Sequence, residues 1–60
     1  MINDEDLKLI AKNLAHRYKD DACVQYLYRS MIHSKDWVNV TSCFSVLNGY
    51  MQDNYGFALI

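Results

Sequence analysis

In the first third of the chain, apolar side chains recur every three or four residues, the spacing of one helix face. The members of this stripe are Leu7, Ile10, Ala11, Leu14 and Tyr18. The start of the helix is well signalled, because Asn3 can cap it and the acidic residues that follow complement the positive end of the helix dipole. We expect a helix over residues 4–19, with an ion pair between Asp4 and Lys8 one turn apart.

A second apolar stripe follows, with no glycine or proline between the two. It consists of Cys23, Val24, Leu27, Tyr28, Met31 and Ile32. At about 100° per residue, this stripe is rotated by roughly 100° from the first, so one straight helix would present two different faces. A break at residues 19–21 lets both stripes face one core, and either Asp20 or Asp21 can cap the new helix. The pattern therefore predicts a second helix over residues 21–33.

A third stripe lies in the C-terminal half and is formed by Val40, Cys43, Phe44, Leu47, Tyr50 and Met51. It predicts a helix over residues 36–53, capped by Ser34 or Asp36. Residues 37–41 also alternate and are β-prone, so a short strand is an alternative there. Gly49 could end the helix, but we expect the helix to continue past it. The tail, residues 54–60, is almost wholly apolar and is expected to fold back on the core or dock into a partner.

Length and composition place these helices in one small domain. Sixty residues bury only about 60% of the surface that the unfolded chain exposes, so stability is marginal without help. The chain is 52% hydrophobic, which is a heavy apolar load for so small a molecule. We expect a single all-α domain over residues 1–60: a three-helix bundle, or a helical hairpin plus a third helix, that self-associates as a homodimer or larger homo-oligomer.

The charge pattern argues against several partners. The formal net charge is −1, with six Lys/Arg against seven Asp/Glu, so no overall field attracts nucleic acid or an anionic membrane. The longest uncharged run, residues 37–52, is interrupted by polar side chains and does not resemble a membrane span. The N-terminus is acidic where a secretory signal would be basic, which predicts a cytoplasmic protein.

The potential metal ligands and nucleophiles are few and widely spaced. His16, Cys23, His33 and Cys43 are separated by six, nine and nine residues, whereas zinc ligands usually come in close pairs. Both cysteines fall on apolar stripes, where thiols are protonated and inert. We therefore expect no metal, no cofactor and no enzymatic activity. The cysteines are expected to be buried free thiols, with a Cys23–Cys43 bridge as the alternative.

Apolar residues left over after the three stripes are packed are the candidate contacts for another protein. They are Tyr26, Val38, Val46, Tyr55, Phe57, Leu59 and Ile60. Aromatic side chains anchor interfaces because they bury much area at little entropic cost. A basic side of the first helix, formed by Lys8, Lys12, His16 and Lys19, is a candidate nucleic-acid contact, although we favour a solvated helix face as its explanation.

The functional expectation follows from size and from the absence of catalytic motifs. We expect a non-enzymatic regulator or inhibitor that binds a larger protein stoichiometrically, of the kind carried by phages and mobile elements: an anti-defence inhibitor, an antitoxin or a modifier of host machinery. One alternative is a helical dimer that binds nucleic acid through the first helix. The other is a structural subunit that assembles with itself.

Overall fold

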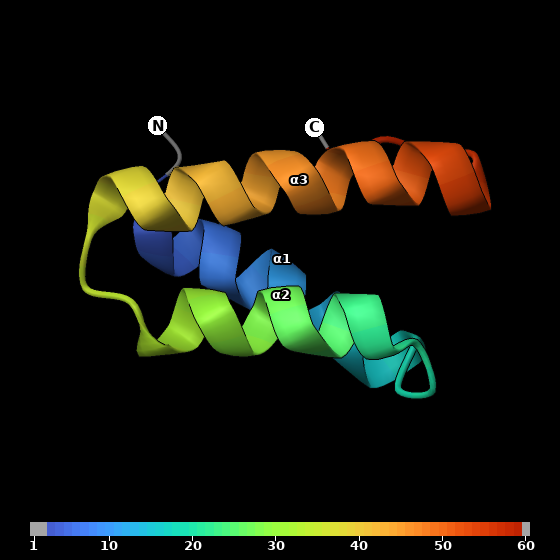
Figure 1. Cartoon of the computed structure of the whole chain (residues 1–60), viewed down its shortest axis with the longest axis horizontal. Helices are drawn as coiled ribbons and strands as arrows, with labels where there is room; N and C mark the ends of the chain where they lie inside the picture. Colours follow the sequence, from blue (N-terminus) through green and yellow to red (C-terminus); the bar gives the residue numbers. More distant parts are fainter. Residues whose placement is uncertain (1–2, 60) are drawn as a thin grey trace.

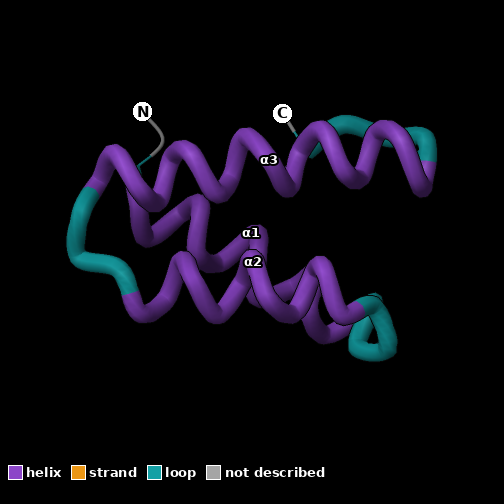
Figure 2. Tube along the Cα trace, viewed as in Figure 1, coloured by secondary structure: helices purple, strands orange, loops and turns teal. Residues whose placement is uncertain are grey.

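The computed structural model describes residues 3–59, which form three helices and, within that range, no strand. Helix α1 spans Asp4–Arg17, α2 spans Ala22–His33 and α3 spans Trp37–Tyr55. Helices α2 and α3 run antiparallel in one layer, and α1 packs behind both of them (Figures 1 and 2). Every pair of helices is in contact. The protein is therefore an all-α three-helix bundle, as the three stripes predict.

Helix α1 begins where expected and ends two residues early. Asn3 and Asp6 form a capping box, in which the Asn3 side chain accepts from the Asp6 amide at 3.0 Å. At the other end, Tyr18 leaves the helical conformation (φ −114°, ψ 50°). The Gln25 side-chain amide donates to the carbonyls of Ala15 at 2.8 Å and Tyr18 at 3.2 Å. A side chain of α2 therefore provides hydrogen-bond donors for two carbonyls at the end of α1.

The structure resolves which residues cap the other two helices. Asp21, not Asp20, caps α2, and Asp36 caps α3 with Ser34 supporting it by accepting from the Asp36 amide at 3.2 Å. Helix α3 passes through Gly49 and extends two residues beyond the expected end. It stops at Gly56, whose φ of +78° lies in the left-handed region that favours glycine.

The core is formed by the inward stripes of the three helices. Its buried members are Leu7, Ala11, Leu14, Ala15, Val24, Leu27, Met31, Val40, Phe44, Leu47 and Met51. The stripes predict all of them except Ala15, an alanine on the side of α1 that faces α2. Two expectations were wrong. Ile32 lies at the edge of the α2 stripe and is 40% exposed, and Cys23 and Cys43 are free but only partly buried.

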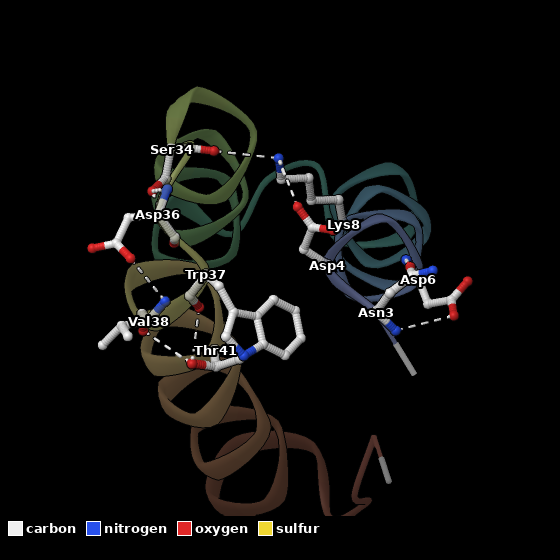
Figure 3. A network of polar contacts seen from close by, with 9 residues as sticks. All are labelled: Asn3, Asp4, Asp6, Lys8, Ser34, Asp36, Trp37, Val38 and Thr41. Carbon is white, nitrogen blue, oxygen red and sulfur yellow. Dashed lines mark hydrogen bonds and ion pairs between the residues drawn. The ribbon is translucent and has the colours of Figure 1, made fainter. Parts of the chain in front are cut away.

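A network at the α2–α3 loop connects it to α1 (Figure 3). The Lys8 ammonium donates to the Ser34 carbonyl at 3.3 Å and lies 4.0 Å from the Asp4 carboxylate, which confirms the expected ion pair. On α3, the Thr41 hydroxyl donates to the carbonyls of Trp37 and Val38, both at 3.0 Å. Lys8 therefore links the α2–α3 loop to α1, whereas the Thr41 bonds lie within the start of α3.

The segment that follows α3 turns back along that helix (Figure 2). The Leu59 amide donates to the Asn48 side-chain oxygen at 2.7 Å, and the Leu59 side chain packs against the core. Phe57, by contrast, is exposed. The expected apolar tail over residues 54–60 is thus shorter, because residues 54 and 55 belong to α3. Ile60 lies outside the described residues.

None of the helices in residues 3–59 combines the length and apolar character needed to cross a membrane.

Candidate functional site

Asp21 is the centre of the most concentrated polar contacts in the described chain. As N-cap of α2, its Oδ1 accepts from the amides of Cys23 at 3.0 Å and Val24 at 3.2 Å. The Tyr50 hydroxyl donates to both carboxylate oxygens, at 2.9 and 2.7 Å, and the Tyr55 hydroxyl donates to Oδ2 at 2.6 Å. One carboxylate therefore joins the start of α2 to the last two turns of α3.

Three tyrosine rings gather around this carboxylate. The ring centroids of Tyr18 and Tyr55 are 4.4 Å apart with the planes tilted by 43°, and those of Tyr50 and Tyr55 are 6.4 Å apart with an edge-on arrangement. Tyr18 comes from the C-terminal end of α1, whereas the other two come from α3. Aromatic pairs with these separations stabilise one another beyond the area they bury. The ring positions are consequently fixed by contacts from two helices.

The tyrosines and the α1–α2 turn line an open hollow of about 670 Å³ at one end of the bundle. Its lining residues are Arg17, Tyr18, Lys19, Asp20, Asp21, Ala22, Cys23, Tyr50 and Tyr55. We call this the tyrosine hollow. Figure 1 shows the α1–α2 turn and the end of α3 at the same end of the bundle. Its tyrosines come from the end of α1 and the end of α3 and form what we call the aromatic floor, whereas its charged rim comes from the α1–α2 turn and the residues beside it.

The hydrogen bonds determine the protonation of the cluster. Donation from Tyr55 and then from Tyr50 holds the pKa of Asp21 below its ordinary value of 3.8. The hydrogen bond from Tyr50 to Asp21 raises the pKa of Tyr50 from 10.0 to about 12, and the hydrogen bond from Tyr55 to Asp21 raises the pKa of Tyr55. Near neutral pH the cluster is therefore one carboxylate held by two neutral phenols.

The candidate contact residues fall into separate groups. Tyr55 lines the tyrosine hollow from the last turn of α3, Phe57 is exposed just after that helix, and Leu59 is partly buried against the core. Tyr26 on α2 and Val46 on α3 are 66% and 58% exposed, in the middle of their helices. Val38, also exposed, lies in the first turn of α3. The structure thus does not join the predicted contacts into one surface.

The basic side of α1 is interrupted at its start and continues into the hollow. Lys8 is held by Asp4 and Ser34, as described above, whereas Lys12 and His16 are exposed. Lys19 lies in the α1–α2 turn and lines the tyrosine hollow. The four residues therefore do not form one uniform strip of free charge. Nucleic-acid binding stays a prediction that these contacts do not test.

Among residues 3–59, no three His, Cys, Asp or Glu side chains gather where a metal ion could be held. His16 and His33 are both exposed, at the ends of α1 and α2 respectively. The hollow offers ring faces, one fixed carboxylate and two flexible cations, Arg17 and Lys19, which suit non-covalent recognition.

Sequence reasoning identified Asp21 as a possible cap but did not find the cluster around it. Tyr50 and Tyr55 are 29 and 34 residues away from Asp21. Tyr18 and Tyr50 were assigned to the core stripes, which they do join at their edges. Their hydroxyl groups carried no periodic signal that paired them with a carboxylate. Only the three-dimensional fold shows that the hydroxyls of these distant tyrosines reach the residue that caps α2.

No known protein family, curated protein or solved structure matches the chain.

Proposed function

We propose that the protein is a non-enzymatic regulator or inhibitor that binds a larger protein stoichiometrically, with the tyrosine hollow as its binding site. The observation that carries the proposal is the gathering of Tyr18, Tyr50 and Tyr55 around Asp21 in a hollow of about 670 Å³. Sites that bind ligands or partner side chains are commonly concave and aromatic, with volumes of about 300–1,000 Å³.

The fixed position of the rings supports high-affinity binding. Tyrosine is enriched among the residues that dominate binding energy, because it offers a large amphipathic surface with few torsions to immobilise. Here Tyr50 and Tyr55 are already held by Asp21, and Tyr18 stacks on Tyr55. Since these side chains are ordered before binding, a partner that fills the hollow loses less conformational entropy in forming the complex.

The rim favours a protein segment over a purely apolar ligand. Arg17 and Lys19 stand beside Asp20 and Asp21, so both signs of charge border the aromatic floor. A segment that inserts one apolar or aromatic side chain and pairs its flanking polar groups with this rim matches that arrangement. Exposed Phe57, two residues after Tyr55, adds apolar surface at the same end of the chain.

The experiment is affinity capture with the tagged protein, compared among three variants. Tyr18→Ala removes a ring from the hollow whose hydroxyl has no hydrogen bond in the described structure. Leu9→Ala removes an exposed apolar side chain from α1 outside the hollow, and Lys12→Glu reverses a charge on the basic side of α1. We expect Tyr18→Ala to lose the captured protein, and the other two to retain it.

Calorimetry with the purified partner then gives the stoichiometry, which we expect to be one partner per hollow. Circular dichroism verifies that each variant keeps its helices. Capture that is unchanged by Tyr18→Ala would exclude the hollow as the site. Loss of binding in Lys12→Glu alone, with nucleic acid in the captured fraction, would favour the nucleic-acid alternative.

A further inference from the structure

The layer formed by α2 and α3 has a broad face that is turned away from α1 (Figure 1). On α2, Val24, Leu27 and Met31 point into the core and Gln25 bonds to the end of α1. At about 100° per residue, Tyr26 therefore lies on the side away from α1. On α3, Phe44 points into the core and Tyr50 reaches α2, so Val46 also lies on the side away from α1. We call this surface the α2–α3 face.

The α2–α3 face has an apolar centre and no charge in its middle. It comprises Cys23, Tyr26 and Ser30 from α2 with Asn39, Cys43 and Val46 from α3. Tyr26 and Val46 are near the midpoints of their helices and are two of the most exposed large apolar side chains in the described chain. Arg29 flanks the face on α2, one helical turn from Tyr26, and His33 and Asp53 border it at its two ends. An apolar centre with a polar border is the anatomy of a protein interface.

Charge is distributed unevenly over the molecule. Of thirteen charged residues, six Lys/Arg and seven Asp/Glu, nine precede Ala22. The exposed side of α1 is therefore charged, whereas α3 is exposed on one side yet carries no charged residue between Trp37 and Gln52. Solvated helix faces are normally polar and charged. The α3 half of the α2–α3 face thus lacks the charged side chains that keep an exposed face solvated.

We infer that the α2–α3 face is covered by a second copy of this chain in a symmetric dimer. In a two-fold dimer each face meets itself, so charged residues near the axis would meet their own sign. The centre of this face contains none. Tyr26 and Val46 would meet Tyr26 and Val46 of the second copy around the axis, and the four helices of the two layers would form a new apolar centre.

The available area agrees with such a dimer. The Cα positions extend over 27 × 20 Å across the broad view, in a molecule only 15 Å thick. Two faces of this size bury roughly 1,000 Å² in projection, about the lower limit for a specific interface, and side-chain relief adds to that figure. A foreign partner would be selected by complementary charges, which this surface does not offer.

The tyrosine hollow lies at one end of the bundle and shares Cys23 with the α2–α3 face, whereas Tyr26 and Val46, at the centre of that face, do not line the hollow. The inference is independent of the proposed function. Its test is the mass in solution, whereas the test of the hollow is partner capture.

The experiment is sedimentation equilibrium over a range of concentrations, with three variants. Val46→Lys and Tyr26→Lys each place a charge at the centre of the α2–α3 face. Leu9→Lys is the matched control, because Leu9 is 56% exposed, almost the same as Val46 at 58%, but lies on α1. All three positions are exposed, so the substitutions leave the monomer core intact, which circular dichroism verifies.

We expect the wild-type protein and Leu9→Lys to approach twice the chain mass of 7.0 kDa as concentration rises. Val46→Lys and Tyr26→Lys should remain at the mass of one chain over the same range, because each should raise the dissociation constant of the dimer at least tenfold. The inference is overturned if the wild-type protein stays at one chain mass at high concentration. It is equally overturned if the two face variants dimerise as the wild type does.

Discussion

The Tyr55 hydroxyl donates a 2.6 Å hydrogen bond to the Asp21 carboxylate, which joins the last turn of α3 to the first turn of α2 across 34 residues. The same carboxylate caps α2 and accepts from Tyr50. A single side chain therefore serves two purposes that are usually separate: it satisfies the amides at a helix start, and it fixes the relative position of two helices.

Replacing Asp21 should destabilise the protein more than replacing its neighbour. Asp21→Ala removes the cap of α2, which by itself costs about 1 kcal/mol, and also leaves the two phenols without their acceptor. Asp20→Ala, at an exposed position with no described side-chain hydrogen bond, should change the free energy of unfolding very little. Urea denaturation followed by circular dichroism measures both. Equal effects of the two variants would contradict the assigned role of Asp21.

Stability should decline at both extremes of pH through this cluster. Because the pKa of Asp21 is lowered in the folded state, its contribution is present above pH 3.8 and is lost as pH falls through the folded pKa. The pKa of Tyr50 is raised to about 12, so its contribution is present below pH 10 and is lost as pH rises towards 12. Thermal melts across this pH range give the profile.

The variant that separates the alkaline effect is Tyr50→Phe. It removes the titrating hydroxyl, and should therefore reduce the loss of stability between pH 10 and 12. Tyr26→Phe changes a tyrosine without a described hydrogen bond and should leave the profile as it is in the wild type. If Tyr50→Phe loses as much stability between pH 10 and 12 as the wild type, the loss is caused by other groups.

The two glycines should respond to alanine in opposite directions. Gly49 lies inside α3, and an added Cβ there would have no neighbour within 4 Å. Gly49→Ala should stabilise the helix by about 0.5–1 kcal/mol. Gly56 has a φ of +78°, so Gly56→Ala should destabilise the chain by about 1 kcal/mol. Denaturation midpoints of the two variants test the prediction, and stabilisation by Gly56→Ala would be incompatible with the left-handed cap.

Adjacent positions on α3 should differ sharply in their tolerance to truncation. Leu47 is completely buried among the three helices, so Leu47→Ala should cost about 2–5 kcal/mol, enough to unfold much of so small a domain. Val46→Ala, at an exposed position, should have a small effect on the dilute monomer. Thermal denaturation at low concentration compares them. Similar losses for both variants would show that Val46 is part of the monomer core.

The three helices and almost the whole core were predictable, because their apolar residues follow the helical period without interruption. The phase shift between the first two stripes located the α1–α2 break, and Asn3 marked the start of α1. The ends of the helices were harder to predict. Tyr18 is apolar and in phase with α1, yet it leaves the helix because the chain must reverse there. The expectation that α3 continues past Gly49 was confirmed, but the end of the helix at Gly56 depends on a left-handed backbone conformation that the pattern does not show.

The tyrosine hollow could not be derived from the pattern. Periodicity assigns Tyr18 and Tyr50 to core faces by their rings, and it contains no information about where their hydroxyls point. Side chains that are apolar along one edge and polar at the tip are placed by the packing of the helices, which only the three-dimensional fold supplies.

Because Tyr55 is the last residue of α3, the hollow is complete only while the final turn of that helix is folded. Helix ends open more readily than helix centres, and each opening of that turn withdraws both the Tyr55 ring and its bond to Asp21. During synthesis, the hollow can be completed only after residue 55 has left the ribosome, when α1 and α2 are already available to pack. Occupancy of the hollow and folding of the last turn of α3 are consequently coupled, so a bound partner would slow amide exchange at the end of α3.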